Sequence, residues 1–325
     1  MDNVTIKVGV IGCGTIAVMR HLPEYAARSD VEIAAVYNRT PAKAEEVQRQ
    51  YGGIVCKSVE ELVAMDLDAV SVCSVNAEHT RDSILALRAG KHVLCEKPMG
   101  ITMEDCEAMT EEAEKAGKLL MIAHNQRFSE QHVNAHELIA SGGIGRVLSF
   151  DAGFGHAGPE VWTGDKDTWF FHRQAAGMGV LADLAVHKID LIHYLTGEPV
   201  AEIYARTATL DKRYPDGRPI DVEDNAWCLC RTESGISGTL RVSWTNYGDM
   251  FDYIVIYGSK GTVSCYDAWK DSPVTGVIDE FVDCIKTGRP CRSTGREALK
   301  SMRAVFAALE SSQTGTVIKI PENVK

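Results

Sequence analysis

The chain has 325 residues, a formal net charge of −11, 45% hydrophobic residues and 24% charged residues. This length fits roughly two domains of ordinary size, each long enough to bury a core of its own. The negative charge disfavours broad contact with nucleic acid or anionic lipid, because both repel an acidic surface, although a local basic pocket for a phosphate stays compatible with it.

The beginning of the chain and its cysteines predict a cytoplasmic protein. The segment MDNVTIKVGVIG has no basic region followed by a long apolar stretch, so it does not resemble a signal peptide. No apolar run reaches the roughly 20 residues that a membrane helix needs. Ten cysteines lie scattered without a Cys-x-x-Cys pair, which favours reduced thiols over a metal site. The ten histidines are dispersed as well, so we predict no metal.

The first 123 residues alternate short apolar runs with amphipathic stretches. We predict strands over residues 6–11, 32–37, 69–73, 92–95 and 119–123, and helices over residues 21–28, 41–51, 80–89 and 103–116. Repeated β-then-α order predicts a doubly wound parallel sheet with right-handed crossovers. We therefore place a dinucleotide-binding domain at residues 1–123.

The pattern changes in residues 124–325, which we assign to a second, α+β domain. We predict helices over 130–140, 180–195, 276–286 and 296–312, and strands over 147–153, 201–209, 226–232, 236–244, 253–257, 262–266 and 317–320. Several of these strands alternate apolar and polar residues, which indicates an open, largely antiparallel sheet with one covered face. We expect six strands, with helices on one side.

A glycine-rich turn follows the first predicted strand and opens a helix. It reads Gly12-Cys-Gly14-Thr-Ile-Ala17. Gly12 permits the tight turn, and Gly14 lets the backbone approach a pyrophosphate, which the free N–H groups at the helix N-terminus attract. We therefore predict a dinucleotide here, in contact with Gly12, Gly14, Thr15 and Ile16.

The end of the second predicted strand bears on which dinucleotide binds. An enzyme for NAD commonly carries Asp or Glu there to accept from the ribose hydroxyls. This chain has Asn38, Arg39 and Thr40 instead. Asn38 does not repel a 2′-phosphate, Arg39 is able to pair with one, and Thr40 is able to donate to it. We predict NAD(P) with a preference for NADP, and dual use stays open.

Two further segments supply candidate catalytic groups. Glu96-Lys97-Pro98 ends the fourth predicted strand, and ligands of open α/β sheets bind beyond the carboxyl ends of strands. Lys97 would stabilise an alkoxide there. On the predicted helix 180–195, Asp183 and His187 are four residues apart and share a face, which Asp190 joins. His187 is a candidate general base, and a core histidine beside a packing aspartate is the alternative.

Together, these motifs resemble the glucose–fructose oxidoreductase, inositol dehydrogenase and rhizopine-catabolism family, written Gfo/Idh/MocA. The likeness covers nearly the whole chain and includes the helix motif Gly-x-Gly-x-Leu-x-Asp-x-x-x-His-x-x-Asp. It implies a Rossmann domain, the catalytic set Lys97, Asp183 and His187, and a homo-oligomer, dimer or tetramer, built through the second-domain sheet. Ala185 departs from the glycine of many relatives, so a slightly altered pocket is expected.

The resemblance also assigns residues outside these motifs. Ser74, Asn76 and His79, in the loop after the third predicted strand, and Glu96 with Lys97 would border the cofactor, and Asn125 and Arg127 would contact the substrate. The leading hypothesis is hydride transfer between nicotinamide and a hydroxyl-bearing carbon of a sugar, polyol or inositol. A cofactor-assisted glycosidase or lyase and a non-catalytic dinucleotide-binding regulator are the alternatives.

Overall fold

A computed structural model describes residues 5–267 and 275–321 of the chain. They form two compact units. The N-terminal unit comprises residues 5–123 and 275–299, and the C-terminal unit comprises residues 124–267 and 300–321. Within the described residues, no helix is long and apolar enough to cross a membrane.

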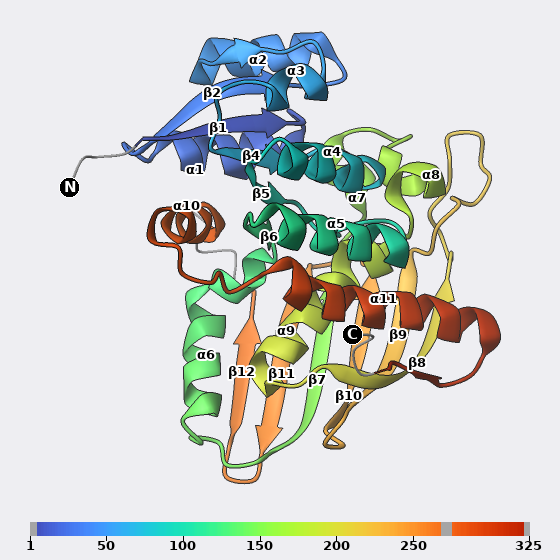
Figure 1. Cartoon of the computed structure of the whole chain (residues 1–325). Coiled ribbons are helices and arrows are strands. Elements are labelled where there is room, and N and C mark those ends of the chain that lie inside the picture. The colour runs from blue at the N-terminus through green and yellow to red at the C-terminus, as the bar shows by residue number, and fades with distance from the viewer. Residues whose placement is uncertain (1–4, 268–274, 322–325) are drawn as a thin grey trace. The chain divides into compact units, whose positions relative to one another are not determined.

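The N-terminal unit is built on a six-stranded parallel sheet (Figure 1). Its strands lie in the order β3-β2-β1-β4-β5-β6, which is the doubly wound arrangement with β1 beside β4 at the switch point. The strands are β1 Ile6–Ile11, β2 Val31–Tyr37, β3 Ile54–Val55, β4 Ala69–Val72, β5 His92–Cys95 and β6 Leu120–Ile122. The five strands that we predicted are confirmed, and the two-residue β3 is an addition too short to leave a hydrophobic period in the sequence.

The helices of this unit begin and end where local signals place them. Ser58 and Thr102 accept from backbone N–H groups three residues on, and so cap α3 and α5. Gly117 ends α5 in the left-handed conformation. In Figure 1, α4 and α5 run side by side. The helices are η1 Ala17–His21, which is a π-helical turn, α1 Leu22–Ala26, α2 Pro41–Tyr51, α3 Val59–Val63, α4 Asn76–Arg88 and α5 Met103–Ala116.

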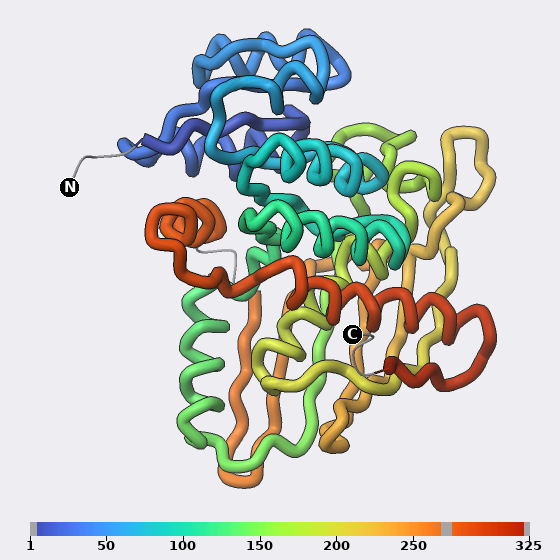
Figure 2. The backbone as a smooth tube through the Cα atoms, viewed as in Figure 1, coloured from blue at the N-terminus to red at the C-terminus, as the bar shows by residue number. Residues whose placement is uncertain are grey.

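Residues 275–299 return to the N-terminal unit, although we had assigned everything after residue 123 to the second domain. They include helix α10 (Val277–Thr287), which Figure 2 shows in orange-red. The guanidinium of Arg28 contacts Asp279 and Asp283 of α10 at 2.6 and 3.0 Å. Such ion pairs join residues some 250 positions apart, so no local pattern in the sequence announces them.

The C-terminal unit contains a seven-stranded sheet in the order β12-β11-β7-β10-β9-β8-β13. Its strands are β7 Val147–Gly155, β8 Val200–Ala208, β9 Asn225–Thr232, β10 Ser237–Ser243, β11 Phe251–Gly258, β12 Thr262–Tyr266 and β13 Ile318–Lys319. The largely antiparallel pairing is confirmed, with β10 and β7 as a parallel pair. Our expectation of a six-stranded sheet was wrong by one, because the short strand that we predicted at 317–320 joins the sheet as β13, at the edge beside β8.

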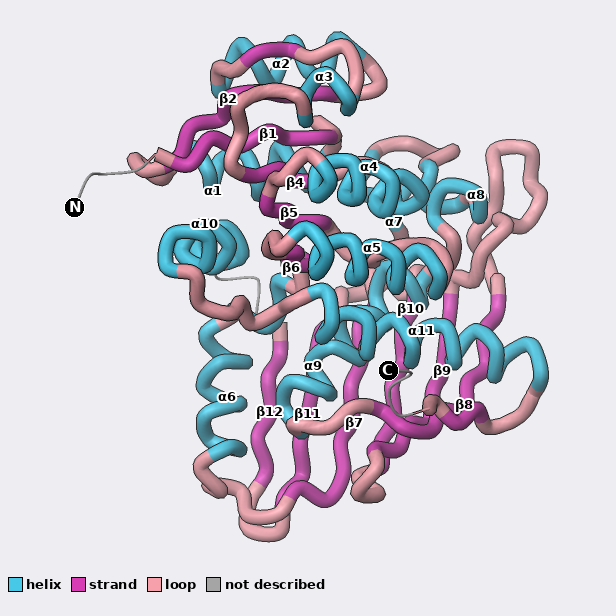
Figure 3. The backbone as a smooth tube through the Cα atoms, viewed as in Figure 1, coloured by secondary structure: helices cyan, strands magenta, loops and turns pink. Residues whose placement is uncertain are grey.

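One face of this sheet is covered by helices and the other is exposed, as alternation along β9 shows. Cys228 and Cys230 are buried, whereas Trp227 and Leu229 are 42% and 56% exposed. Figure 3 shows α9 (Val186–Thr196) and α11 (Gly295–Thr314) in front of the strands. The helices of this unit are η2 Asn125–Phe128, α6 Glu130–Ala140, α7 Pro159–Thr163, η3 Trp169–Phe171, α8 Arg173–Ala176, η4 Leu181–Ala185, α9 Val186–Thr196 and α11 Gly295–Thr314, which begins in the N-terminal unit.

Candidate active site

The turn after β1 has the shape that a phosphate site requires. Gly12 has a φ of +91°, and a Cβ there would lie 2.5 Å from the carbonyl carbon of Cys73, so only glycine fits. A Cβ on Gly14 would meet nothing within 4 Å, which leaves the space beside the backbone open. Thr15 and Ile16 start the following helical segment and are exposed. These four residues therefore fit a pyrophosphate at a helix N-terminus.

Asn38 stabilises this turn from the end of β2. Its Oδ1 accepts from the backbone N–H of Cys13 at 2.9 Å, and its Nδ2 donates to the carbonyl of Thr40 at 3.0 Å. Arg39 and Thr40 are exposed. The second strand thus ends in an uncharged amide followed by an exposed guanidinium and hydroxyl, on the edge where the ribose of a dinucleotide lies in this fold.

The loop after β4 is held against the loop after β5. The ring of His79 lies between two carbonyls, with Nδ1 2.8 Å from the oxygen of Pro98 and Nε2 3.0 Å from that of Ser74. Burial lowers the pKa of His79. Ser74 also donates to Asp82 at 2.9 Å, and burial raises the pKa of Asp82 to about 6. His79 and Asn76 are both buried. The His79 ring therefore positions the two loops by contacting their backbone carbonyls, at Ser74 and Pro98.

Lys97 is the second residue after the end of β5 and is joined to Pro98 by a cis peptide bond. Glu96 before it is buried, and its two carboxylate oxygens are engaged. One lies 2.9 Å from Nε2 of His21, and the other accepts from the backbone N–H of Lys97 at 3.1 Å. Glu96, which we predicted as a cofactor residue, is thus part of the structure that holds Lys97.

Asp183 lies in the π-helical turn η4, where we had predicted an unbroken helix over 180–195. Gly179 lies two residues before this turn, and a Cβ there would lie 1.9 Å from the carbonyl oxygen of Glu223. The Glu223 carboxylate accepts from the N–H groups of Gly179 and Leu181 at 2.8 and 3.1 Å, and burial raises its pKa. A distant carboxylate therefore serves as the cap of this turn.

The Asp183 carboxylate has two neighbours from the sheet. The indole N–H of Trp244 donates to its Oδ2 at 3.0 Å, and Nε2 of His156 lies 3.8 Å from the same oxygen. His187, in the first turn of α9, is 8% exposed, and its ring lies 6.1 Å from that of Phe154, which is two residues before His156. Asp183, His187 and His156 therefore gather around the end of β7.

Sequence reasoning missed three residues of this group, namely Trp244, His156 and Glu223. They come from the ends of strands β10, β7 and β9 or from the loops beside them. The sequence offers little to single them out, because a tryptophan after an alternating strand reads as ordinary packing. Only the sheet order, with β7 and β10 as parallel neighbours, brings them to the start of the long helix.

Arg127, which we predicted to contact substrate, is buried and paired within the C-terminal unit. Its guanidinium holds Asp190 bidentately, at 2.6 Å from Nε and 2.7 Å from Nη2. Burial by itself would raise the pKa of Asp190. The neighbouring Arg127 and histidines have the larger, opposite effect, so the pKa lies below its usual value. This pairing gives Arg127 a structural role that competes with the predicted one. Asn125 precedes it in η2 and is half-buried.

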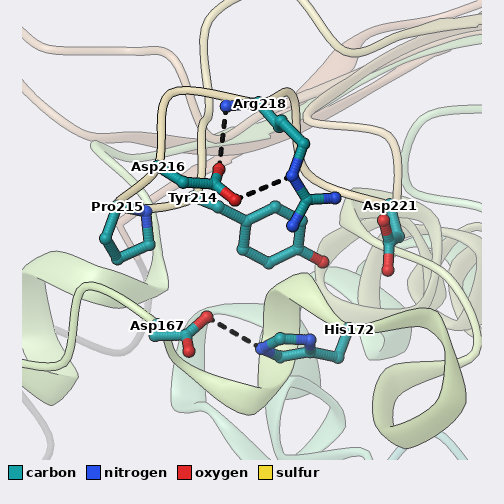
Figure 4. Close-up of a pocket in the computed structure, with 7 residues that line it drawn as sticks. All are labelled: Asp167, His172, Tyr214, Pro215, Asp216, Arg218 and Asp221. Atoms are coloured by element: carbon teal, nitrogen blue, oxygen red, sulfur yellow. Dashed lines mark hydrogen bonds and ion pairs between the residues drawn. The ribbon is translucent and has the colours of Figure 1, made fainter.

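The long loop carries aromatic side chains that pack beside the Asp183 group. The ring of Phe170 lies 3.9 Å from Trp169 and 6.4 Å from Trp244. Further along this loop is a cleft of about 330 Å³ (Figure 4), where Asp167 pairs with His172, and Asp216 with Arg218. Four of its charged or titratable side chains are thus paired with one another. Across the described residues, no group of three or more His, Cys, Asp or Glu side chains is placed to hold a metal ion.

Two family models match the chain along most of its length. The oxidoreductase family with an NAD-binding Rossmann fold matches residues 6–124, and the GFO/IDH/MocA C-terminal domain matches residues 132–264. The 1,5-anhydro-D-fructose reductase of Ensifer adhaerens is 30% identical over 96% of this chain and 98% of its own length. The chain belongs to the Gfo/Idh/MocA oxidoreductase family. It is therefore an enzyme of the dehydrogenase and reductase class.

Other family members agree in sequence and fold. The D-glucoside 3-dehydrogenase of Escherichia coli (strain K12) is 30% identical in a match that covers 62% of this chain and 57% of that enzyme's length. The crystal structure of GenD2 from gentamicin A biosynthesis, in complex with NAD, has a TM-score of 0.89 at 24% identity, covering 98% of this chain and 97% of GenD2. The Gfo/Idh/MocA fold, with its parallel and mostly antiparallel sheets, is thus confirmed.

Proposed function

We propose that this chain is an NAD(P)-dependent dehydrogenase that oxidises a secondary hydroxyl of a sugar, polyol or inositol, or reduces the corresponding ketone. The observation that carries the proposal is the buried group at the start of α9. There Trp244 donates to one oxygen of Asp183, His156 lies 3.8 Å from the same oxygen, and His187 lies in the next turn. Relatives named for sugar substrates support the same substrate class.

The residues divide the chemistry among them. The nicotinamide, when bound, exchanges a hydride with the substrate carbon. His187 accepts the proton of the hydroxyl as the carbonyl forms, and returns it in the reverse direction. Lys97 stabilises the negative charge that develops on that oxygen. Asp183, held by an indole N–H, positions the substrate or His187.

We propose NADP as the preferred cofactor, with Asn38, Arg39 and Thr40 as the residues that distinguish it from NAD. The side chain of Asn38 is occupied by the glycine turn and brings no negative charge to the ribose. Arg39 and Thr40 are exposed beside it, where a guanidinium pairs with a 2′-phosphate. Ser74, Asn76 and His79 would hold the nicotinamide side.

We further propose a cytoplasmic homo-oligomer that forms through the exposed face of the C-terminal sheet. This face presents Trp227, Leu229, Tyr257 and Tyr266, each more than 40% exposed. Exposed apolar groups gathered on one face are typical of an interaction surface. The ten cysteines are thiols and all buried, which is compatible with a reducing compartment.

The test is a panel of sugars and polyols assayed with NADP and with NAD, followed by Lys97→Ala on the best substrate. We expect turnover to fall a hundredfold or more while NADPH binding survives. Lys115→Ala, an exposed lysine on α5, is the matched control and should keep full turnover. Unchanged turnover in Lys97→Ala contradicts the mechanism, and sugar cleavage without net reduction of NADP favours the lyase alternative.

A further inference from the structure

A buried histidine lies behind Lys97 and has no part in the chemistry described so far. His21 is at the end of the π-helical turn η1, and its side chain is 3% exposed. Its Nε2 lies 2.9 Å from Glu96, and its Nδ1 lies 2.7 Å from the hydroxyl of Ser71 in β4. Both ring nitrogens are thus fixed by neighbours from β4 and from the end of β5.

The charges of this pair support each other. Burial opposes a charge on the imidazole, but Cys73 and Glu96 beside it outweigh that effect and raise the pKa of His21 well above its usual value. Burial likewise opposes the carboxylate, and His21 lowers the pKa of Glu96 below its usual value. Both shifts favour the charged forms, an imidazolium beside a carboxylate, and removing one partner leaves the other buried without its counter-charge.

The pair acts on Lys97 through the backbone. One oxygen of Glu96 is held by His21, and the other accepts from the N–H of Lys97. The carboxylate orientation therefore fixes the peptide group from which the Lys97 side chain departs. A residue placed this way matters for rate, because a displacement of about 1 Å at a reacting group costs up to a hundredfold.

We propose that His21 is a positioning residue for Lys97, which it orients by holding the Glu96 carboxylate against the Lys97 backbone. The proposal rests on the catalytic role of Lys97 proposed above. It assigns a function to the start of the first helix, separate from phosphate binding at Gly12 and Gly14.

The experiment compares His21→Leu, which removes both contacts, with His21→Gln, whose amide still reaches toward Glu96. Three quantities are measured: kcat, the Kd of NADPH, and the rate at which Lys97 is reductively methylated in the cofactor-free protein. We expect kcat of His21→Leu to fall at least tenfold, with the Kd of NADPH changed less than threefold and Lys97 methylation changed at least threefold. His21→Gln should recover most of the loss.

His92→Gln is the matched control, since this histidine of β5 only accepts from the N–H of Leu119. The double variant His21→Leu with Glu96→Gln should lose no more kcat than the worse single variant, because both changes break the same contact between His21 and Glu96. If His21→Leu does not fold, Ser71→Ala, which removes the contact to Nδ1, should lower kcat about threefold. The proposal is overturned if folded His21 variants keep full kcat, if the losses add, or if only NADPH affinity falls.

The methylation rate separates this proposal from the proposed function. If Lys97→Ala keeps full turnover, the catalytic role of Lys97 fails. A changed methylation rate of Lys97 in His21→Leu would then still show that His21 positions it. If Lys97→Ala is inactive and Lys97 methylation is the same in all His21 variants, the positioning proposal fails alone.

Discussion

The indole N–H of Trp244 helps to orient the Asp183 carboxylate. Trp244 is fully buried, and its Nε1 donates to Asp183 at 3.0 Å. Trp244→Phe keeps a ring beside Phe170 and Phe171 but removes this donor, so the carboxylate loses one of its hydrogen bonds. We expect kcat/KM to fall about tenfold and the free energy of unfolding to fall by about 1–3 kcal/mol, the cost of an unsatisfied buried partner. Steady-state kinetics and urea titration measure the two effects.

Trp227→Phe, on the exposed face of β9, serves as the control for this change, because Trp227 lies away from Asp183. It should leave kcat/KM within twofold. A Trp244→Phe variant that loses stability but keeps its kcat/KM would mean that Asp183 tolerates reorientation, and the positioning role assigned to the indole would be wrong.

Among the elements, the two π-helical turns are the ones most closely tied to the proposed site. Turn η1 ends in His21, and turn η4 contains Asp183. π turns are rare in proteins as a whole, but those that occur often lie at functional sites. The extra residue of such a turn redirects a side chain. At the start of η4, the Glu223 carboxylate accepts from the N–H groups of Gly179 and Leu181.

Gly179→Ala tests the packing at the start of η4. The added methyl group would lie 1.9 Å from the carbonyl oxygen of Glu223, so helix and loop must separate. We expect the free energy of unfolding to fall by about 3 kcal/mol, within the range of strongly overpacked sites. Gly248→Ala is the control, since a Cβ there meets nothing within 4 Å, and it should change stability by less than about 0.5 kcal/mol. Equal stability of the two variants in urea titration would contradict this account.

Element positions were largely predictable, and partner choice was not. The predicted helices 41–51, 103–116 and 130–140 coincide with α2, α5 and α6, because periodicity and capping act over a few residues. The contact of Glu223 with Gly179, just before the π turn at Asp183, was missed, since the two residues lie 44 positions apart. The bidentate pair of Arg127 and Asp190, 63 positions apart, was missed for the same reason. Contacts of this length depend on sheet order, which local patterns do not encode.

At the scale of the whole molecule, buried histidines predict acid sensitivity of the C-terminal unit. Burial lowers the pKa of His132 to about 4 and that of His193 to about 3. The fold therefore prefers the neutral rings, so stability is full above the unfolded pKa of about 6.5 and is lost as the pH falls toward the folded values. Between pH 7.5 and pH 5, the free energy of unfolding of His132→Gln should fall by about 2 kcal/mol less than that of the natural chain. Urea titrations at the two pH values measure this difference. An identical loss in both proteins would contradict the prediction.

The exposed sheet face provides the second prediction at this scale. Trp227→Glu combined with Leu229→Lys places charges at the centre of the proposed oligomer surface, where their burial would be costly. We expect sedimentation analysis to give a monomer for this variant and an oligomer for the natural chain. Leu138→Lys, an exposed leucine on helix α6 away from this face, should leave the oligomer intact. An oligomer that survives the paired change lies on another surface.

The burial of every cysteine also makes this chain a convenient host for site-specific labels. The ten thiols are shielded from solvent, and burial raises the pKa of Cys228 to about 12, which suppresses the reactive thiolate. A single cysteine introduced at an exposed position such as Lys115 or Met19 would therefore react with a maleimide dye far faster than the native ones. Fluorescent reporters of ligand binding become accessible without first removing any native residue.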